Sequence, residues 1–501
     1  MVTLKWDLTS RCNMACHHCY NHDPHAGSDI ERKRDLTTGE ITSIIRRFEG
    51  QVKLVQLLGG EPLCHPDFFR IIEEFNRAGA AVQMNTNALA LDEDAMRRIL
   101  GLDFCRLVVG LDGPDALTND AIRGAGTFDR VLGNVERALE LRERARPIHI
   151  SIHYTVTATN MLAAPRMIPF CQSLGLDDVY FLRAQPLGLA AKNELDVLID
   201  DDQWFATCER IAETAAARPG KTTVWVFPPA ILLNDYLNAK YGCSIPIHPY
   251  TCTGASAYFY IRSNGETFPC GKGLKTRALR HAGRLNVRAN DVLHMGLDEL
   301  LSSPSFRAAF AFYHDETRRC EYQPCNRCRY RSMCDSCPVE MEFGRLVTGS
   351  ETCVNGICLR AEQALAAIPR RGQVDNRVVA FPEPELAVEP AQVIPDSVPR
   401  RNPRANFAPW GDGLKLYTPA TSEYLSLNAG GTCIWDLIDG TRSVEEIARA
   451  VSAAGEVSMQ QAREWVSEFI GPLVARGAVL VPEQRAGAAE RNNPAGVTAV
   501  K

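Results

Sequence analysis

The sequence predicts an α/β protein built on a parallel sheet, followed by an irregular cysteine-rich region and a small α+β domain. From residue 3 to about 227, short apolar runs alternate with amphipathic helical stretches, as in strand-helix repeats joined by right-handed crossovers. After that the alternation is lost and cysteines crowd together. With 501 residues, of which 45% are hydrophobic, the chain is long enough for roughly two to four domains.

Six apolar runs are predicted as strands, with Val, Ile and Leu on both faces because parallel sheets are usually covered on both sides. They are residues 3–8, 52–58, 80–85, 105–111, 148–156 and 179–184. Helices are predicted between them. One begins after Thr37, where Glu40 completes a capping box, and another covers residues 66–79 and stops at Gly79.

Unusual residues follow these strands at their carboxyl ends. A cysteine loop follows the first strand, GGEP (residues 59–62) follows the second, and NTN (residues 85–87) ends the third. GLDGP (residues 110–114) ends the fourth strand, and Arg183 ends the sixth. The carboxyl ends of parallel strands share one edge, where ligand sites are built, so the sequence predicts a single site there.

The cysteine loop contains Cys12, Cys16 and Cys19 at the spacing C-x3-C-x2-C. A structural zinc site needs four protein ligands, and a disulfide framework needs an even number of cysteines. Three thiolates can instead hold three irons of a cluster and leave the fourth iron open. The alternative is a zinc knuckle completed by His17 or His18, which leaves the residues at the other strand ends unexplained.

Charge and composition restrict the partners. A net charge of −5 and a pI near 6.2 give no general attraction to nucleic acids or anionic membranes. The start of the chain has no export-signal pattern, and there is no uncharged apolar run of about 18 residues. We therefore expect a soluble cytoplasmic protein with neither a nucleic-acid nor a membrane partner, in which clustered cysteines bind metal rather than form disulfides.

The N-terminal region resembles the radical S-adenosylmethionine (SAM) superfamily through the C-x3-C-x2-C motif and GGEP. The resemblance implies a partial (β/α)6 barrel with a 4Fe-4S cluster on Cys12, Cys16 and Cys19. The open iron would chelate SAM, whose reductive cleavage gives a 5′-deoxyadenosyl radical. It also implies SAM contacts from Gly59, Gly60, Glu61, Pro62, Asn87, Gly110, Asp112 and Arg183. His18 and Gly110 depart from the family pattern, which commonly has an aromatic residue and Ser there.

The second group of cysteines resembles the SPASM extension of peptide- and protein-modifying radical SAM enzymes. The matching residues are Cys252, Gly265, Cys270, Cys325, Cys328, Cys334 and Cys337, with a final interval of two residues instead of three. The resemblance implies two auxiliary 4Fe-4S clusters. Four clustered cysteines are also typical of a zinc ribbon, which is the alternative.

The resemblance distributes the cysteines between these two clusters. One is expected on Cys252, Cys270 and Cys337, with Cys243 or Cys320 completing it or an iron left open for substrate. The other is expected on Cys325, Cys328 and Cys334, with either Cys353 or Cys358 as its fourth ligand.

The C-terminal part predicts a compact unit after a linker rich in proline. LKLYTP and YLSLN (residues 414–419 and 424–428) predict a hairpin, followed by helices near 431–440 and 443–451. A third helix begins after Ser458 and breaks or kinks at Pro472. One face of it is predicted to carry Ala462, Trp465, Val466 and Phe469. The predicted domains are 1–235, 236–368, the linker 369–398, 399–485 and a disordered tail 486–501.

Residues 424–451 resemble PqqD-like domains, which recognise peptides. Such a unit would capture an extended leader peptide by adding it as a strand to the hairpin edge. A winged-helix DNA-binding domain is the alternative. Its recognition helix would carry Arg463 against Glu464 and Glu468, which is a poor surface for phosphates.

Together these features predict a radical SAM/SPASM maturase that installs a thioether or carbon-carbon crosslink in a ribosomally made precursor peptide. Residues 399–485 would bind the leader, and a flavodoxin or ferredoxin would donate electrons. One alternative is a radical SAM enzyme acting on a small molecule, a tetrapyrrole or a folded protein such as a sulfatase. The other is a zinc-stabilised peptide adaptor without catalytic activity.

Overall fold

The computed structural model describes most of the chain, and the structural statements below concern those residues. They are 1–22, 25, 27–144, 148–227, 230–247, 252–328, 330–331, 334, 336–349, 354–368, 394–402, 405, 407–410, 413–418, 423–455 and 457–481. Cys353, the disordered tail predicted at 486–501 and most of the predicted linker, residues 369–393, lie outside this set.

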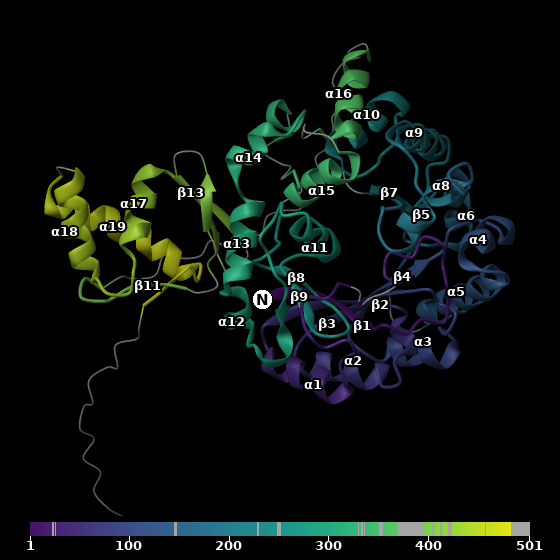
Figure 1. Ribbon diagram of the computed structural model, residues 1–501, viewed down its shortest axis with the longest axis horizontal. Coiled ribbons are helices and arrows are strands. Elements are labelled where there is room, and N and C mark those ends of the chain that lie inside the picture. The colour runs from purple at the N-terminus through teal and green to yellow at the C-terminus, as the bar shows by residue number, and fades with distance from the viewer. Residues whose placement is uncertain are drawn as a thin grey trace, which may run out of the picture.

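A single curved sheet dominates the molecule (Figure 1). Within the described residues its strand order is β10-β9-β8-β1-β2-β3-β4-β5-β6-β7, and strands β1 to β7 are parallel. The bounds are β1 (Val2–Thr9), β2 (Val52–Gly59), β3 (Ala81–Thr86), β4 (Phe104–Gly110), β5 (His149–Val156), β6 (Asp178–Arg183), β7 (Thr223–Phe227), β8 (Tyr258–Ile261), β9 (Glu266–Phe268) and β10 (Asn290–Asp291). The parallel α/β prediction is confirmed, whereas β7 was not among the predicted strands.

Helices between the strands cover the outer face of the sheet. They are α1 (Thr38–Arg47), α2 (Phe68–Arg77), α3 (Glu93–Leu100), α4 (Ala116–Arg123), α5 (Thr127–Arg144), α6 (Met167–Leu174), α7 (Leu189–Lys192), α8 (Glu194–Val197), α9 (Asp201–Ala217) and α10 (Ile231–Tyr241). The capping box predicted at the start of α1 is present. The Thr37 amide donates to the Glu40 carboxylate at 2.7 Å, and the Glu40 amide donates to the Thr37 hydroxyl.

The prediction of apolar residues on both faces holds for β4, where Leu107, Val108 and Val109 are all buried, but not for β5. In β5, Ile150 and Ile152 are fully buried against the helices, whereas Ser151 and His153 point to the opposite side. On that inner side, polar side chains from strands that are not neighbours meet. Asn85 of β3 contacts His153 of β5 at 3.4 Å. The sheet therefore curls around a polar interior rather than packing against a second helical layer.

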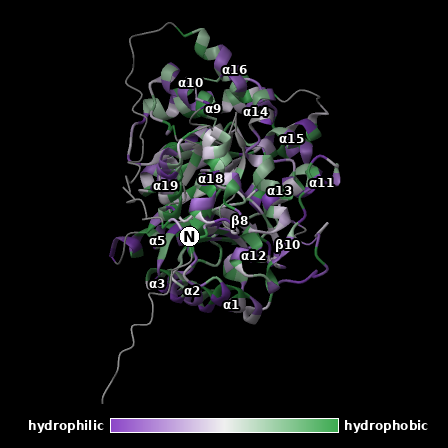
Figure 2. Ribbon diagram, turned by 90° about the vertical axis from the view of Figure 1, so that its left-hand side faces the viewer, coloured by the Kyte–Doolittle hydropathy of each residue, from purple (hydrophilic) through white to green (hydrophobic). Residues whose placement is uncertain are grey.

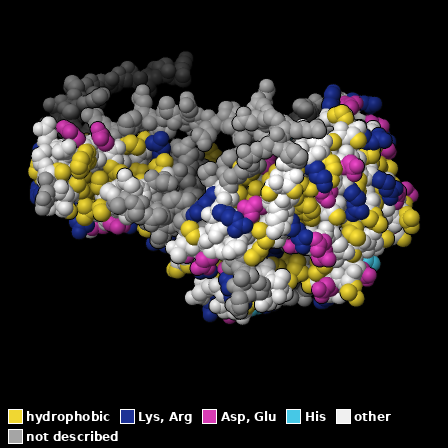
Figure 3. Space-filling view, turned by 90° about the horizontal axis from the view of Figure 1, so that it is seen from above, with side chains coloured by type: hydrophobic (Ala, Val, Ile, Leu, Met, Phe, Trp, Pro, Cys, Tyr) yellow, Lys and Arg dark blue, Asp and Glu magenta, His cyan; other side chains and the backbone are white. Residues whose placement is uncertain are grey.

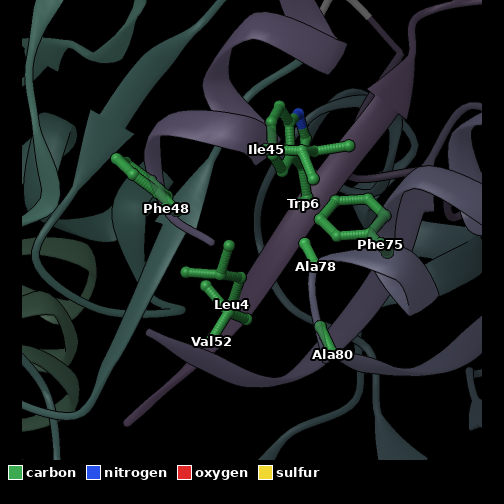
Figure 4. Close-up of a pocket in the computed structure, with 8 residues that line it drawn as sticks. All are labelled: Leu4, Trp6, Ile45, Phe48, Val52, Phe75, Ala78 and Ala80. Carbon is green, nitrogen blue, oxygen red and sulfur yellow. The ribbon is translucent and has the colours of Figure 1, made fainter. Parts of the chain in front are cut away.

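One small cavity lies on the outer side of β1, between that strand and helices α1 and α2 (Figure 4). Its volume is about 10 Å³, and apolar side chains such as Leu4, Trp6 and Phe75 line it. A space of this size holds one water at most. It is a packing gap and not a ligand site.

The region after β7 extends the sheet and adds short helices. They are α11 (Gly273–His281), α12 (Leu297–Leu301), α13 (Pro304–Tyr313), α14 (Glu316–Glu321), α15 (Pro338–Thr348) and α16 (Gly356–Ala366). Strand β8 pairs with β1, and ion pairs join this region to the loop before α1. Arg280 pairs with Asp29, and Arg32 pairs with Asp291 at 2.8 Å.

The C-terminal residues form a separate lobe beside α13 (Figure 1). Its elements are β11 (Arg400–Arg401), β12 (Phe407–Trp410), β13 (Gly413–Thr418), β14 (Glu423–Leu427), α17 (Ala429–Leu437), α18 (Val444–Gly455), α19 (Met459–Ala475) and β15 (Val479–Leu480). The hairpin β13–β14 and three helices agree with the prediction, whereas β12 and the β11–β15 pair were not predicted. Leu416, Trp435, Ile447 and Val466 belong to a core of its own.

Helix α19 corrects two details of the sequence analysis. Trp465 is 44% exposed, because the buried stripe of this helix runs through Ala462, Val466 and Ile470 and Trp465 lies beside it. The helix also continues through Pro472 to Ala475, so the predicted break at this proline is not present.

The surface is mixed in charge. In Figure 3 the Lys and Arg side chains alternate with Asp and Glu over the larger lobe. Figure 2 shows hydrophobic segments gathered toward the middle of the molecule, with hydrophilic ones at its margins. In the part of the chain that the structure describes, no helix combines the length and apolar character needed to cross a bilayer.

Candidate cofactor site at the carboxyl ends of the strands

The GGEP segment packs directly against the cysteine loop that follows β1. The Gly60 amide donates to the Thr9 carbonyl at 2.8 Å, and the Glu61 amide donates to the Arg11 carbonyl at 2.7 Å. A Cβ at Gly60 would collide with the carbonyl of Arg11, so only glycine permits this approach. The two motifs predicted to share a site are therefore in contact.

Three thiols lie together in that loop. Cys12 is exposed, and Cys16 and Cys19 are half-buried. Burial raises the pKa of all three thiols. The negative charge of one thiolate raises the pKa of another in addition: Cys19 raises that of Cys12, Cys12 that of Cys16, and Cys16 that of Cys19. A metal bound there would displace the thiol protons. The donor set and its mutual proximity fit an iron-sulfur cluster with three protein ligands.

Glu61 is a buried carboxylate that ties the GGEP segment to the end of β3. It accepts hydrogen bonds from the Thr86 hydroxyl at 2.7 Å, from the Asn87 amide at 2.6 Å and from the Leu63 amide at 3.2 Å. Burial raises its pKa to about 7, although these hydrogen bonds act in the opposite direction. Because protein donors bind both of its oxygens, Glu61 fixes the segment and leaves backbone groups to meet a ligand.

Asn87 reaches from the end of β3 to the cysteine loop. Its side-chain amide donates to Asn13 at 2.7 Å and lies 3.8 Å from the sulfur of Cys12. The structure thus brings Asn87, GGEP and the thiols together, as the sequence predicted.

Asp112 lies beneath the loop and joins it to α4. It is fully buried and bonds to His18 Nε2 and to Arg123 Nε, each at 2.6 Å, and to the Thr155 amide at 2.7 Å. Burial alone would raise the pKa of Asp112, but the positive charges of Arg123 and His18 outweigh it and hold that pKa well below its usual range. The carboxylate therefore orients the loop from below.

Sequence reasoning missed Arg123, the last residue of α4. A Cβ at position 110 would lie 2.7 Å from its guanidinium, which explains why this position is occupied by glycine. Its charge also lowers the pKa of Cys16 against the effect of burial. The signal that could have found it is the buried Asp112, which requires a cationic partner.

Arg183 has other partners. Its guanidinium pairs with Asp201 at 2.6 Å and donates to the Ile199 carbonyl, both at the start of α9. The segment after Arg183 does reach the site, because the Leu189 amide donates to the Cys19 carbonyl at 2.8 Å and Asn193 donates to His17 at 3.0 Å. That segment covers one side of the cysteine loop.

Cys252, Cys270 and Cys337 lie near one another beside α13. The Tyr313 hydroxyl donates to the sulfur of Cys270 at 3.3 Å. Burial raises the pKa of the same tyrosine, and the charges of Cys270 and Cys252 add to the effect. Burial raises the pKa of Cys337 to about 11, with a further contribution from Cys270. This is the grouping expected for the first auxiliary cluster.

Cys325, Cys328, Cys334 and Cys358 form the other group. Burial raises the pKa of Cys358 well above its usual value, and the charges of the other three thiols add to it. Cys358 and Cys353 were the two alternatives for the fourth ligand of this cluster. Cys358 lies near the other three cysteines, while Cys353 lies outside the described residues.

The two remaining candidates have local partners. Cys243 donates to the side-chain oxygen of Asn238 at 3.2 Å, and Cys320 accepts from Arg331 at 3.1 Å. Among the described residues, no three His, Cys, Asp or Glu side chains converge as the ligands of one ion would. The ligands of a cluster bind different irons and need not converge on one point.

Three regions of the chain match known families. Residues 6–162 match the Radical SAM superfamily, residues 252–329 the SPASM iron-sulfur cluster-binding domain and residues 414–479 Coenzyme PQQ synthesis protein D (PqqD). The chain therefore carries a radical SAM domain, a SPASM domain and a PqqD domain, in the predicted order. It is an enzyme, which sets aside the non-catalytic adaptor. The radical SAM match implies a 4Fe-4S cluster with SAM, and the SPASM match indicates further iron-sulfur binding.

Relatives of this radical SAM enzyme carry different names. The AdoMet-dependent heme synthase of Methanosarcina barkeri is 27% identical over 278 residues, which are 54% of this chain and 76% of that protein. Mycofactocin maturase MftC of Mycobacterium tuberculosis is 32% identical over 161 residues. That match covers 32% of this chain and 39% of the maturase, so it spans less than half of that relative.

Solved structures show the same fold. SuiB of Streptococcus suis bound to S-adenosylmethionine has a TM-score of 0.52 at 15% identity, over 71% of this chain and 77% of that chain. SuiB bound to precursor peptide SuiA has a TM-score of 0.51 at 16% identity, over 71% of this chain and 75% of that chain.

Proposed function

We propose that this radical SAM enzyme modifies a ribosomally made precursor peptide whose leader binds to residues 399–485. The observation that carries the proposal is the PqqD-matching lobe on the same chain as the barrel. Strand β12 of this lobe contacts α13, whose Tyr313 is bonded to Cys270. A leader held by this lobe is thus tethered close to the first auxiliary group, which raises the local concentration of the core peptide.

The leader would bind as an added strand. In the sheet β12-β13-β14, strand β12 covers one edge of the hairpin and β14 forms the other edge of the described sheet. Edge strands offer unpaired backbone groups to an incoming peptide. We place the leader along β14, with selectivity coming from side chains on either side of it.

Cys12, Cys16 and Cys19 would hold the SAM-binding cluster, and residues 59–62, Asn87 and Gly110 would surround SAM. When bound, these groups supply an electron and a 5′-deoxyadenosyl radical that removes a hydrogen atom from the peptide. The chain's own part is to hold the loop. Glu61 fixes it from the β3 side, and the Asp112–Arg123 pair fixes it from below.

Arg183 and Asp112 keep their proposed places at this edge with modified roles. Arg183 would need to exchange Asp201 for SAM, because its guanidinium is already paired. Asp112 is bonded to protein on both oxygens and would act by positioning the loop.

Two auxiliary clusters would complete the chemistry, on the two groups of cysteines described above. After hydrogen abstraction, the peptide must lose a further proton and an electron to form a thioether or a carbon-carbon bond. An auxiliary cluster would accept that electron, and a flavodoxin or ferredoxin would supply the electrons that start each cycle. The peptide then loses two hydrogen atoms overall.

A small molecule or tetrapyrrole is the second candidate substrate, since the match to the heme synthase covers more of that relative than the match to the maturase does. A folded protein, such as a sulfatase, is the other alternative substrate. The PqqD-matching lobe favours the peptide, because a free small molecule needs no leader-binding domain.

The test compares the full chain with a chain that ends at residue 398, using synthetic peptides that correspond to any short open reading frames found beside the gene. We expect the full chain to remove two hydrogen atoms from the peptide, as measured by mass spectrometry. The shortened chain should keep peptide-independent SAM cleavage and raise the KM for the peptide roughly a hundredfold. Its main core does not depend on the lobe, which has a separate core. An unchanged KM, or an unmodified peptide, would contradict the proposal.

A further inference from the structure

Three aromatic side chains form a continuous row on the inner face of the barrel. The strand register pairs Gly110 with His153, His153 with Tyr180, and Tyr180 with Trp225 across β4, β5, β6 and β7. The centroids of His153 and Tyr180 lie 5.1 Å apart, and those of Tyr180 and Trp225 lie 5.4 Å apart with an angle of 1° between the rings. We call His153, Tyr180 and Trp225 the aromatic row.

The polar atoms at the margins of the row are already bonded to protein. Arg106 donates to the Tyr180 hydroxyl at 2.8 Å, and the Trp225 indole donates to Asp178 at 3.0 Å. Asn85 lies 3.4 Å from His153 Nδ1. All three rings are nevertheless half-buried rather than enclosed. Because Tyr180 stacks on Trp225 and has His153 on its other side, the row presents mainly the edges of its rings to the interior. Ring edges recognise an aromatic group by an edge-to-face contact rather than by hydrogen bonds.

The position of the row links it to the cofactor site. Its first member, His153, pairs with Gly110, and a Cβ added at Gly110 would meet the guanidinium of Arg123 beneath the cysteine loop. The row therefore runs from the SAM-binding edge across the barrel to its last parallel strand. A group lying on the row would be next to the place where hydrogen abstraction starts.

We propose that the aromatic row binds an aromatic side chain of the core peptide and so selects which residue is presented to SAM. This inference rests on the proposed function, because it names the kind of residue that the maturase would accept. A ring in edge-to-face contact binds about two- to tenfold more tightly than an aliphatic group that buries similar area. Arg106 holds Tyr180 in the row, because its guanidinium lies 5.2 Å from the Tyr180 ring centroid and donates to the Tyr180 hydroxyl.

The test measures binding and needs no turnover. The probes are N-acetyl-tyrosinamide and N-acetyl-leucinamide, added to the full chain after anaerobic cluster reconstitution and saturation with SAM. Titration by saturation-transfer NMR should give a dissociation constant about two- to tenfold lower for the tyrosine probe. The preference should disappear in Trp225→Ala and persist in Trp225→Phe and Tyr180→Phe, which keep the rings.

Trp465→Ala is the matched control, because it makes the same change on the exposed surface of α19 and should keep the preference. Tyr180→Leu interrupts the same row and serves if Trp225→Ala does not fold by circular dichroism. Equal affinity for the two probes in wild type, or a preference that survives both disruptions, would overturn the inference. Displacement of the tyrosine probe by protoporphyrin IX at lower concentration would assign the row to a tetrapyrrole instead.

Failure of the inference and failure of the proposed function are distinguishable. If the precursor peptide is modified but the row shows no aromatic preference, only the inference falls. If the row binds the tyrosine probe but no peptide is modified, the proposed function falls and the row remains an aromatic binding site.

Discussion

The barrel region, residues 1–227, and the cysteine-rich region, residues 252–368, are held together in different ways. In the barrel, strands of five to eight residues bury apolar side chains against helices on one face. In the cysteine-rich region the strands have two to four residues, and its apolar side chains, such as Phe306 and Phe310, join the same core, with buried ion pairs such as Arg277 with Glu266 beside them. Because this region has little regular strand structure, we expect bound clusters to contribute more to its stability than to that of the barrel.

The sharpest way to break this comparison is to remove each set of cysteines in turn. Cys325→Ala/Cys328→Ala/Cys334→Ala should lower the Tm of the reconstituted protein by roughly 10 °C, because a structural metal site contributes folding free energy. Cys12→Ala/Cys16→Ala/Cys19→Ala should leave the Tm within about 2 °C of wild type. Thermal unfolding followed by circular dichroism measures both, with exposed Cys105→Ala as the control. Equal losses of Tm would refute the contrast.

Arg123 tests whether the barrel has its own critical buried charge. Arg123→Ala leaves Asp112 buried without its strongest partner, so we expect the free energy of unfolding in urea to fall by about 3–5 kcal/mol. Arg137→Ala removes an arginine that pairs with Glu140 and is 54% exposed, and it should change the same quantity by less than about 1 kcal/mol. If the two variants were equally stable, the Asp112–Arg123 pair would not be what holds the loop.

Glu61 gives a smaller effect that depends on pH. Its pKa in the folded chain is about 7, above the ordinary value of 4.5, so the folded state binds more protons between these values than the unfolded state does. Wild type should therefore lose stability as pH rises from about 4.5 to 7, by up to about 3 kcal/mol relative to Glu61→Gln, and the difference should be constant at higher pH. Urea unfolding of both proteins at several pH values measures it, and parallel curves would contradict this role.

Much of the barrel and the location of its site were predictable, because both follow local rules. Apolar runs gave the first six strands, and capping residues such as Thr37 gave helix starts. The position of motifs after strands placed GGEP and Asn87 beside the cysteine loop. In the C-terminal lobe, the helix that contains Trp435 was predictable from its local sequence as well.

What could not be predicted depends on tertiary contacts. Arg123 acquires its role only when α4 folds under the cysteine loop, and nothing in its local sequence marks it. The polar inner face of the barrel appears only once Asn85 and His153 meet across β4. Trp465 fits the helical period of α19, but the width of the buried stripe is set by the neighbouring elements.

The most direct test of separate cluster sites in the two regions is the iron and sulfide content of the anaerobically reconstituted chain, compared with Cys12→Ala/Cys16→Ala/Cys19→Ala. The account predicts roughly twelve irons per wild-type chain and roughly eight in the variant, which should also stop forming 5′-deoxyadenosine. Bound zinc without broad absorbance near about 400 nm in wild type would contradict it.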